Sequence, residues 1–302
     1  MPSRCTVYEV GPRDGLQNES ARVSTADKIA FVDALSAAGL PVIEAGGFVG
    51  PASVPQMADS GEVFAGIRRR TGTRYSALVP NLKGLERAVA GRVTEIALFA
   101  AASETFSRRN INRSIDESLT IYADVARAAA GAGLRVRGYV STAFGCPYEG
   151  DVPVSRVIEV TERLLAFGAF EVAVSDTIGI AHPGQVKRVL SDILARVPVD
   201  RIALHFHDTR GTALANVLAA LDFGIATFDA SAGGLGGCPY APGATGNLAT
   251  EDLLYLLHGL GITTGVDLDA VYDASRRIEP IVGHPLASRY VQARTATAAR
   301  ST

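Results

Sequence analysis

Two histidines stand two positions apart in the apolar run RIALHFHD (201–208). Side chains at i and i+2 of a β-strand project from the same face, so His205 and His207 are predicted to point together, with Phe206 on the opposite face. Two imidazoles on one strand can give one metal ion two nitrogen ligands. The alternative is a pair of polar side chains that only form hydrogen bonds. We take the pattern as a candidate metal site.

An Arg-Asp pair follows the β-favouring run TVYEV (6–10), between Gly11-Pro12 and Gly15. Asp14 could bind a cation, and a functional Arg13 would have to face the metal-bound substrate. The alternatives are a helix N-cap at Asp14 or a simple ion pair between the two residues. Two imidazoles, a carboxylate and an amide form a nitrogen and oxygen ligand set that suits Mg²⁺ or Mn²⁺ better than structural Zn²⁺. The predicted metal ligands are Asp14, His205 and His207, with an amide such as Asn247.

A glycine-rich segment, GLGGCPYAPGATGN (234–247), surrounds a single cysteine, Cys238. Glycine and proline at such turns let the backbone come close to a ligand. A buried structural cysteine is more usual inside a strand or a helix, and single thiols serve as catalytic groups in intracellular enzymes. We therefore favour a functional Cys238 over the alternative, a flexible surface loop.

These residues need elements that bring them together, and the chain alternates short β-favouring runs with amphipathic helical segments. About 260 residues hold eight such units, which predicts a (β/α)8 TIM barrel over 1–265. The residues 266–302 are expected to form one helix (267–282) and an irregular tail, not a separate domain. An open doubly wound sheet is the alternative, but no glycine-rich dinucleotide fingerprint follows the first strand. The expected strands are 6–10, 41–46, 74–79, 94–100, 135–142, 170–176, 201–208 and 226–232.

Active sites of such barrels form at the C-terminal ends of the strands. Polar residues at the expected strand ends should therefore meet in space. They are Arg13, Asp14, Glu44, Ser175, Asp176, His205, His207, Asp208, Asp229 and Ser231.

The composition excludes several classes of partner. The formal net charge of -2 does not favour nucleic acid or an anionic membrane surface. No apolar run reaches the roughly 18–20 residues that span a bilayer. The start MPSRCTVYEV leaves no room for a targeting peptide, and three widely spaced cysteines suit reduced thiols. We expect a cytoplasmic protein with no nucleic-acid or membrane partner.

Several motifs closely resemble the 3-hydroxy-3-methylglutaryl-CoA (HMG-CoA) lyase family: VGPRDGLQNE (10–19), GCPYEG (145–150), SDTIG (175–179), HFHDTRGTALAN (205–216) and GGLGGCPYAPGATGNLATED (233–252). The resemblance extends from about Thr6 to Gly265. It implies a divalent cation without a nucleotide redox cofactor, an acyl-CoA substrate, a place in leucine degradation and a homo-oligomer such as a dimer. The implied reaction cleaves HMG-CoA, or a close 3-substituted analogue, to acetoacetate (a 3-oxoacid) and acetyl-CoA.

The same resemblance implies roles for individual residues. Asp14, His205, His207 and Asn247 match the family's metal ligands. Arg13 matches the residue that stabilises the enolate of the departing acyl-CoA, and Cys238 matches a thiol that takes part in proton transfer. Glu44 and Asp176 match acidic site residues, and Glu251 matches a residue that supports the Cys238 loop. Lys83, Arg108 and Arg109 are candidates for the CoA phosphates, with ordinary surface cations as the alternative.

The sequence departs from the family pattern in two places. Ala45-Gly46-Gly47 stands where the family has a run with hydroxyl side chains before Phe48, so we expect a larger pocket beside the acyl group. Arg210 replaces an expected aromatic residue. Two other functions remain: a Claisen-type synthase that condenses an acyl-CoA with a 2-oxoacid on the same barrel, and a non-catalytic CoA-binding protein. The latter would be expected to lack at least one of Arg13, Asp14, His205, His207 and Cys238.

Overall fold

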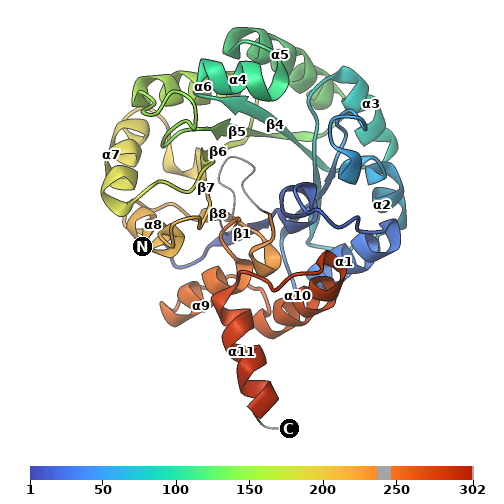
Figure 1. Cartoon of the computed structure of the whole chain (residues 1–302). Helices are drawn as coiled ribbons and strands as arrows, with labels where there is room; N and C mark the ends of the chain where they lie inside the picture. The colour runs from blue at the N-terminus through green and yellow to red at the C-terminus, as the bar shows by residue number, and fades with distance from the viewer. Residues whose placement is uncertain (237–245, 301–302) are drawn as a thin grey trace.

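Eight parallel strands form a closed barrel in sequence order, and β8 pairs with β1 to complete it (Figure 1). The computed structural model describes residues 1–236 and 246–300. The predicted barrel is confirmed, and each strand begins and ends within about two residues of its expected run. The strands are β1 (Thr6–Glu9), β2 (Val42–Gly47), β3 (Arg74–Leu78), β4 (Glu95–Ala101), β5 (Arg135–Ser141), β6 (Glu171–Asp176), β7 (Ile202–Phe206) and β8 (Thr227–Ala230).

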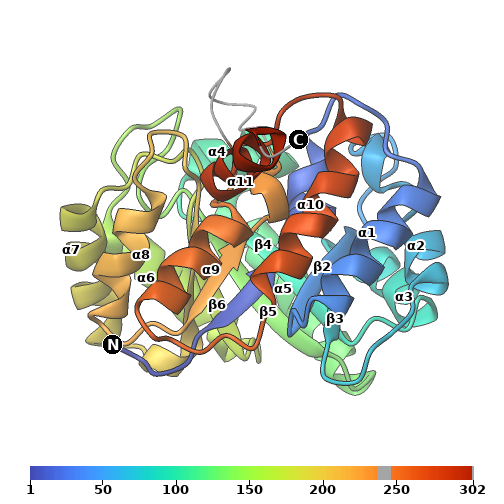
Figure 2. The ribbon, with the colours of Figure 1, turned by 90° about the horizontal axis from the view of Figure 1, so that it is seen from below.

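Helices surround the barrel and cover its outer face (Figures 1 and 2). The helices are α1 (Thr25–Ala37), α2 (Ser60–Gly66), α3 (Leu82–Ala90), α4 (Glu104–Ile111), α5 (Ile115–Gly131), α6 (Val154–Ala166), α7 (Pro183–Leu194), α8 (Ala213–Leu221), α9 (Thr250–Gly259), α10 (Leu268–Val282) and α11 (Arg289–Arg300). Two short turns matter for the site: a π-turn at Gly11–Gly15 and a 3-10 turn at Ala232–Gly234. None of the helices in the described parts of the chain is long and apolar enough to span a membrane.

Strand alternation divides the side chains between two environments. Outward-facing residues such as Ile96 and Val172 join the main apolar core between the barrel and the helices. A smaller cluster of Leu78, Ala97, Tyr139, Ala173 and Ala203 lies apart from that core. Its three alanines, on β4, β6 and β7, leave volume for large side chains such as the fully buried Arg137.

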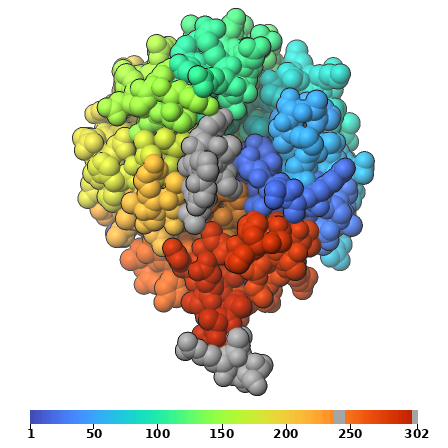
Figure 3. Space-filling view, viewed as in Figure 1, coloured from blue at the N-terminus to red at the C-terminus, as the bar shows by residue number. Residues whose placement is uncertain are grey.

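The C-terminal segment differs from the expected irregular tail, because Arg289–Arg300 forms the helix α11. The Asp252 carboxylate of α9 accepts the backbone N–H groups of Arg289 (2.9 Å) and Tyr290 (2.8 Å), and the Ser288 hydroxyl accepts that of Val291. Free N–H groups at a helix start need such acceptors, and here a distant helix supplies one. α10 packs against α1, and the two C-terminal helices form the red block at one edge of the molecule (Figure 3).

Candidate functional site

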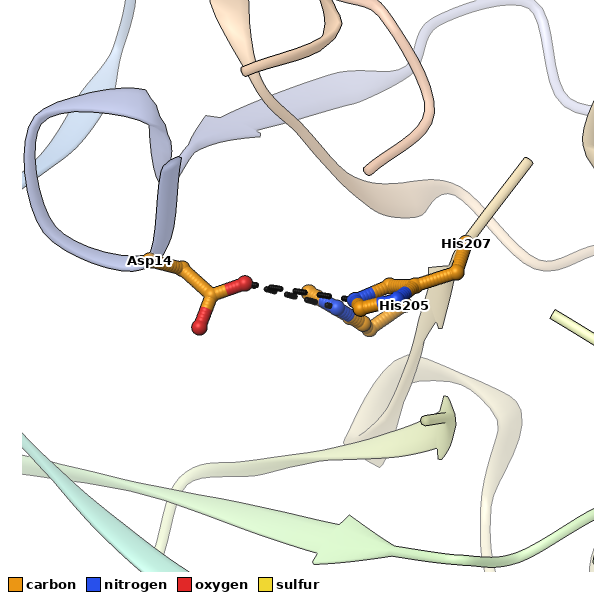
Figure 4. A group of neighbouring side chains, drawn as sticks. All are labelled: Asp14, His205 and His207. Carbon is orange, nitrogen blue, oxygen red and sulfur yellow. Dashed lines mark ion pairs between the residues drawn. The ribbon is translucent and has the colours of Figure 1, made fainter. Parts of the chain in front are cut away.

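The Asp14 carboxylate faces both imidazoles of the H-x-H pair across the barrel mouth (Figure 4). Its Oδ2 lies 4.0 Å from Nε2 of His205 and 4.0 Å from Nε2 of His207. The predicted common orientation of the two histidines is confirmed. A separation of 4.0 Å is too long for a hydrogen bond, but a cation with ligand bonds of about 2.0–2.2 Å can bridge it.

Asn247 adds an amide to this group. Its Nδ2 donates to Asp14 Oδ2 (3.0 Å) and to the carbonyl of Leu235 (3.1 Å), and its backbone forms a β-bridge with His207. Its Oδ1 is buried and has no hydrogen-bond partner among the described residues. A buried acceptor without a partner costs about 1–3 kcal/mol, which a bound cation would remove. The four predicted ligands therefore fit a divalent cation.

The charge states suit metal binding. Burial would raise the pKa of Asp14, but the Arg13 guanidinium and the two imidazoles lower it to about 2. Burial, helped by the neighbouring His205, lowers the pKa of His207 to about 4. At neutral pH the carboxylate is therefore ionised and this imidazole is neutral. These are the forms that coordinate a metal.

Arg13 is held between two carboxylates at the edge of the same group. One guanidinium nitrogen contacts Asp14 Oδ1 at 2.6 Å and the other contacts Glu44 Oε2 at 2.8 Å. The guanidinium lies 5.8 Å from the centre of the Tyr139 ring, whose hydroxyl donates to Glu44 (3.2 Å). Burial raises the pKa of Glu44, and Arg13 opposes that shift. Arg13 is 3% exposed and rigidly positioned, and it borders the cavity.

A cavity of about 560 Å³ opens at the barrel mouth. One end carries Arg13, Asp14, His205 and His207. Polar residues of the 109–112 segment and several apolar side chains also line the cavity. Its volume is in the range of sites that bind small molecules or cofactors. The apolar lining includes Val49, Val54, Leu78, Phe99, Phe106 and Ile111.

Asp176 and Glu251 hold backbone segments and do not line the described cavity. Asp176 accepts the N–H groups of Ile180 and Ala181, each at 3.0 Å, and burial raises its pKa to about 6. Glu251 accepts the N–H of Gly233 and the hydroxyl of Ser275, and burial raises its pKa to about 8. Glu251 thus supports the 3-10 turn before the Cys238 loop. Cys238 itself lies outside the described residues, and its role stays a prediction.

The three candidate CoA-binding cations differ in position. Arg109 lines the cavity, and its guanidinium lies 4.3 Å from the centre of the Tyr148 ring. Arg108 points to the surface and pairs with Glu104 at 3.1 Å. Lys83 is exposed near the start of α3. Only Arg109 of these three borders the described cavity.

Sequence reasoning missed two residues at this site. Tyr139 lines the cavity between Arg13 and His205, and its ring meets the His205 ring edge-on at 6.2 Å. Glu9 accepts the N–H groups of Gly11 (2.8 Å) and Ala232 (2.9 Å) and so joins the Arg-Asp turn to the segment after β8. A charged residue inside the run TVYEV was the available signal for Glu9. Tyr139 shows no signal beyond its place on a strand.

The two glycines of β2 face opposite sides, so the expectation that both enlarge the pocket was wrong for Gly46. A Cβ at Gly46 would lie 2.7 Å from Ser60 Oγ and 3.5 Å from Phe64, toward α2. A Cβ at Gly47 would lie 3.4 Å from Leu78 Cβ and 3.9 Å from Arg13 Cγ, on the cavity side. A register shift between Glu44 and Gly46 produces this arrangement, because a bulge reverses the alternation of side chains.

Comparisons with known proteins show which family the chain resembles. A protein-family model described as HMGL-like matches residues 4–278. The chain is 54% identical over 298 residues, 99% of each chain, to a Pseudomonas aeruginosa protein named 3-hydroxy-3-isohexenylglutaryl-CoA/hydroxy-methylglutaryl-CoA lyase. It is 52% identical to the HMG-CoA lyase structure from Bacillus subtilis, with a TM-score of 0.96 and coverage of 97% and 99%. An Acinetobacter baumannii HMG-CoA lyase in complex with coenzyme A and 3-methylmalate is 42% identical, with a TM-score of 0.92 and coverage of 96% and 95%.

Proposed function

The chain belongs to the HMGL-like family, and from this premise we propose that it cleaves HMG-CoA, or a close 3-substituted analogue, to a 3-oxoacid and acetyl-CoA. The observation that carries the proposal is the pairing of two groups at one cavity. The candidate cation site of Asp14, His205 and His207 lies beside the fixed guanidinium of Arg13. This pairing suits a reaction in which negative charge moves from a hydroxyl oxygen to a thioester oxygen.

The cation site would act on the oxygen end of the reaction. Asp14, His205, His207 and Asn247 would hold a divalent cation, which when bound lowers the pKa of the tertiary hydroxyl of the substrate and orients the neighbouring carboxyl group. Mg²⁺ and Mn²⁺ are the ions that this donor set favours. Asp14 supplies the negative charge of the site.

Arg13 would act on the other end. A base accepts the proton of the hydroxyl, and the C2–C3 bond breaks. The carbon that carried the hydroxyl becomes the carbonyl carbon of the departing 3-oxoacid, and the electron pair of the broken bond becomes the enolate of acetyl-CoA. The guanidinium stabilises that enolate charge. Because the charge is absent in the ground state, this interaction lowers the barrier without tightening substrate binding. Glu44 and Tyr139 hold the guanidinium in place. The enolate then takes a proton at C2, and Cys238 is the proposed participant in that transfer.

The CoA portion would extend from this point along the cavity. Arg109 is the proposed phosphate contact, because its guanidinium borders the cavity and is oriented by Tyr148. The Acinetobacter baumannii relative, whose structure contains coenzyme A, supports an acyl-CoA ligand. Lys83 and Arg108 are exposed and do not line the described cavity.

A substrate with a 3-substituent larger than methyl is a second candidate. Gly47 leaves space beside Arg13 and Leu78 where any other residue would place a side chain. The Pseudomonas aeruginosa relative, 54% identical, is named for a 3-isohexenyl substrate as well as for the methyl compound. Both observations favour a site that accepts the larger group.

The test is turnover of a panel of 3-hydroxy-3-alkylglutaryl-CoA esters with Mg²⁺ or Mn²⁺, followed by identification of both products. We expect acetyl-CoA and the matching 3-oxoacid from at least the methyl ester. Condensation of acetyl-CoA with a 2-oxoacid, without cleavage of any ester, would instead support the synthase alternative. Binding of CoA esters without turnover of any substrate would support a non-catalytic protein.

A further inference from the structure

A buried ion pair lies inside the barrel next to the candidate cation site. Arg137 on β5 is fully buried, two residues before Tyr139 on the same strand, and therefore deeper in the barrel than that cavity-lining residue. Its guanidinium makes two hydrogen bonds to Asp229 on β8, at 2.7 Å and 3.1 Å. Its third nitrogen donates to Glu171 on β6 at 2.9 Å. One side chain thus links three strands.

This pair continues to the H-x-H strand. Asp229 Oδ2 lies 3.2 Å from Nδ1 of His205, and Nε2 of the same imidazole faces Asp14. The guanidinium lies 3.9 Å from the centre of the Tyr8 ring and 4.9 Å from that of Tyr139, so aromatic rings hold it from two strands. The result is a continuous contact chain from Arg137 through Asp229 to His205.

Stability alone gives a weak reason for these charges. Barrels of this kind are usually filled with branched aliphatic side chains. Removing two charges from water costs free energy that their attraction often fails to recover, and apolar replacements of buried ion pairs are often neutral or stabilising. A second reason for keeping these buried charges is their position, because Asp229 contacts the candidate metal ligand His205.

We propose that Arg137 and Asp229 are positioning residues for the cation site, acting through His205. The inference rests on the metal site of the proposed function. A carboxylate can only accept, so Asp229 holds the imidazole proton on Nδ1 and leaves the lone pair of Nε2 directed at Asp14. Arg137 donates hydrogen bonds to both Asp229 oxygens and so fixes the orientation of that carboxylate. The carboxylate in turn fixes the orientation of the His205 ring.

The first test uses Asp229→Asn, which keeps the shape but adds an amide donor that can hydrogen-bond to Nδ1 and reverse the tautomer. The imidazole ¹⁵N signals of the metal-free protein report the tautomer, and the chain has only five histidines. Loss of a signal in His205→Gln assigns it. We expect Nδ1–H in the parent protein and Nε2–H in the variant. Nε2–H in the parent protein would overturn the inference.

The second test is Mn²⁺ affinity, measured from the electron paramagnetic resonance of free Mn²⁺. Loss of a residue that orients a metal ligand typically weakens binding 10–100-fold, and we expect that loss in Asp229→Asn. Glu171→Gln removes the other partner of Arg137 and should change the affinity less than threefold. Lys28→Met breaks a different pair, that of the buried Lys28 with the half-buried Asp59 at 2.7 Å, and should lower the thermal midpoint without changing the affinity.

A triple variant separates positioning from stability. Arg137→Met with Asp229→Leu and Glu171→Gln replaces the pair by apolar side chains, leaves no buried carboxylate without its partner, and is expected to keep the thermal midpoint close to that of the parent. Its Mn²⁺ affinity should still fall 10–100-fold. A triple variant that keeps both stability and affinity would overturn the positioning role of the pair. A parent protein that binds no Mn²⁺ would contradict the metal site of the proposed function, and the metal-free tautomer measurement would still decide the role of Asp229.

Discussion

Arg13 and Asp14 are neighbours in the chain and ion-paired at 2.6 Å, yet they contact different groups. Asp14 directs its other oxygen to two imidazoles, while Arg13 directs its second nitrogen to Glu44. In the proposed reaction, the π-turn that carries both residues would let them act on opposite ends of the breaking bond.

Arg13→Gln is expected to lower kcat by about 10²–10³ and to leave KM nearly unchanged. The guanidinium acts on charge that develops only in the transition state, and one such donor contributes about 3–4 kcal/mol. Steady-state kinetics with HMG-CoA measure the effect. Arg68→Gln, which breaks only the pair with Asp33, is the control and should leave both constants unchanged. A large rise in KM with normal kcat would make Arg13 a binding residue.

Removal of divalent cations with EDTA is expected to abolish turnover, and Mg²⁺ or Mn²⁺ should restore it. The reason is the set of two imidazoles, a carboxylate and an unpaired amide oxygen at one point of the cavity. EDTA already saturated with Mg²⁺ is the control for effects of the chelator itself. Full turnover by protein shown to be metal-free would exclude the mechanism.

The stability of the protein should fall as the pH rises from about 5 to 8, and Glu251→Gln should weaken that fall. Burial raises the pKa of Glu251 to about 8 and that of Glu9 to about 7, so the folded state binds protons more tightly than the unfolded state. Their contribution to stability is complete below the unfolded pKa of about 4.3. It is lost as the pH rises from there through the pKa of each group in the folded protein, at up to about 1.4 kcal/mol per pH unit for each group.

Urea unfolding at pH 5.5, 7 and 8.5 measures this slope. The exposed residue Glu86 gives the control, since Glu86→Gln should leave the slope unchanged. A slope that is equally steep in Glu251→Gln would show that Glu251 is ionised in the folded protein at neutral pH.

Gly47→Ser should shift preference toward the smaller substrate. The new side chain would enter the cavity beside Leu78 and Arg13, where one methylene is worth on the order of 1 kcal/mol. We expect the ratio of kcat/KM for the 3-isohexenyl and 3-methyl esters to fall several-fold. Gly61→Ala, where an added Cβ meets nothing within 4 Å, is the control. An unchanged ratio would mean that the 3-substituent lies elsewhere.

Gly46→Ala is expected to destabilise the fold by about 1–3 kcal/mol, because its Cβ would meet Ser60 Oγ at 2.7 Å. That hydroxyl also accepts the N–H of Gly47 at 3.1 Å, so the strand end itself would shift. The free energy of unfolding in urea measures the loss. Gly61→Ala should instead be neutral or slightly stabilising, since alanine favours the helix. A Gly46→Ala protein as stable as the parent would show that α2 can move away from the new Cβ with little loss of stability.

Much of the fold and part of the site could be predicted from local patterns. Each β-favouring run became a strand, and the alternation rule placed His205 and His207 on one face. The helix α11 was missed, because its first N–H groups find their acceptor on Asp252, 37 residues earlier in the chain. Glu9 was missed for a similar reason, since its partners Ala232 and Thr250 lie on segments distant in sequence.

The sequence by itself determined the barrel, the common face of the two histidines and the turn that presents Arg13 with Asp14. These follow from periodicity and turn chemistry, which act over a few residues. Only the tertiary structure decided that Gly47 rather than Gly46 faces the cavity, because one bulge reverses the alternation. It alone joined Arg137 to Asp229, 92 residues apart, and Asp229 to His205. Strand periodicity predicts which face a side chain occupies, but the closure of the barrel decides which side chains meet across it.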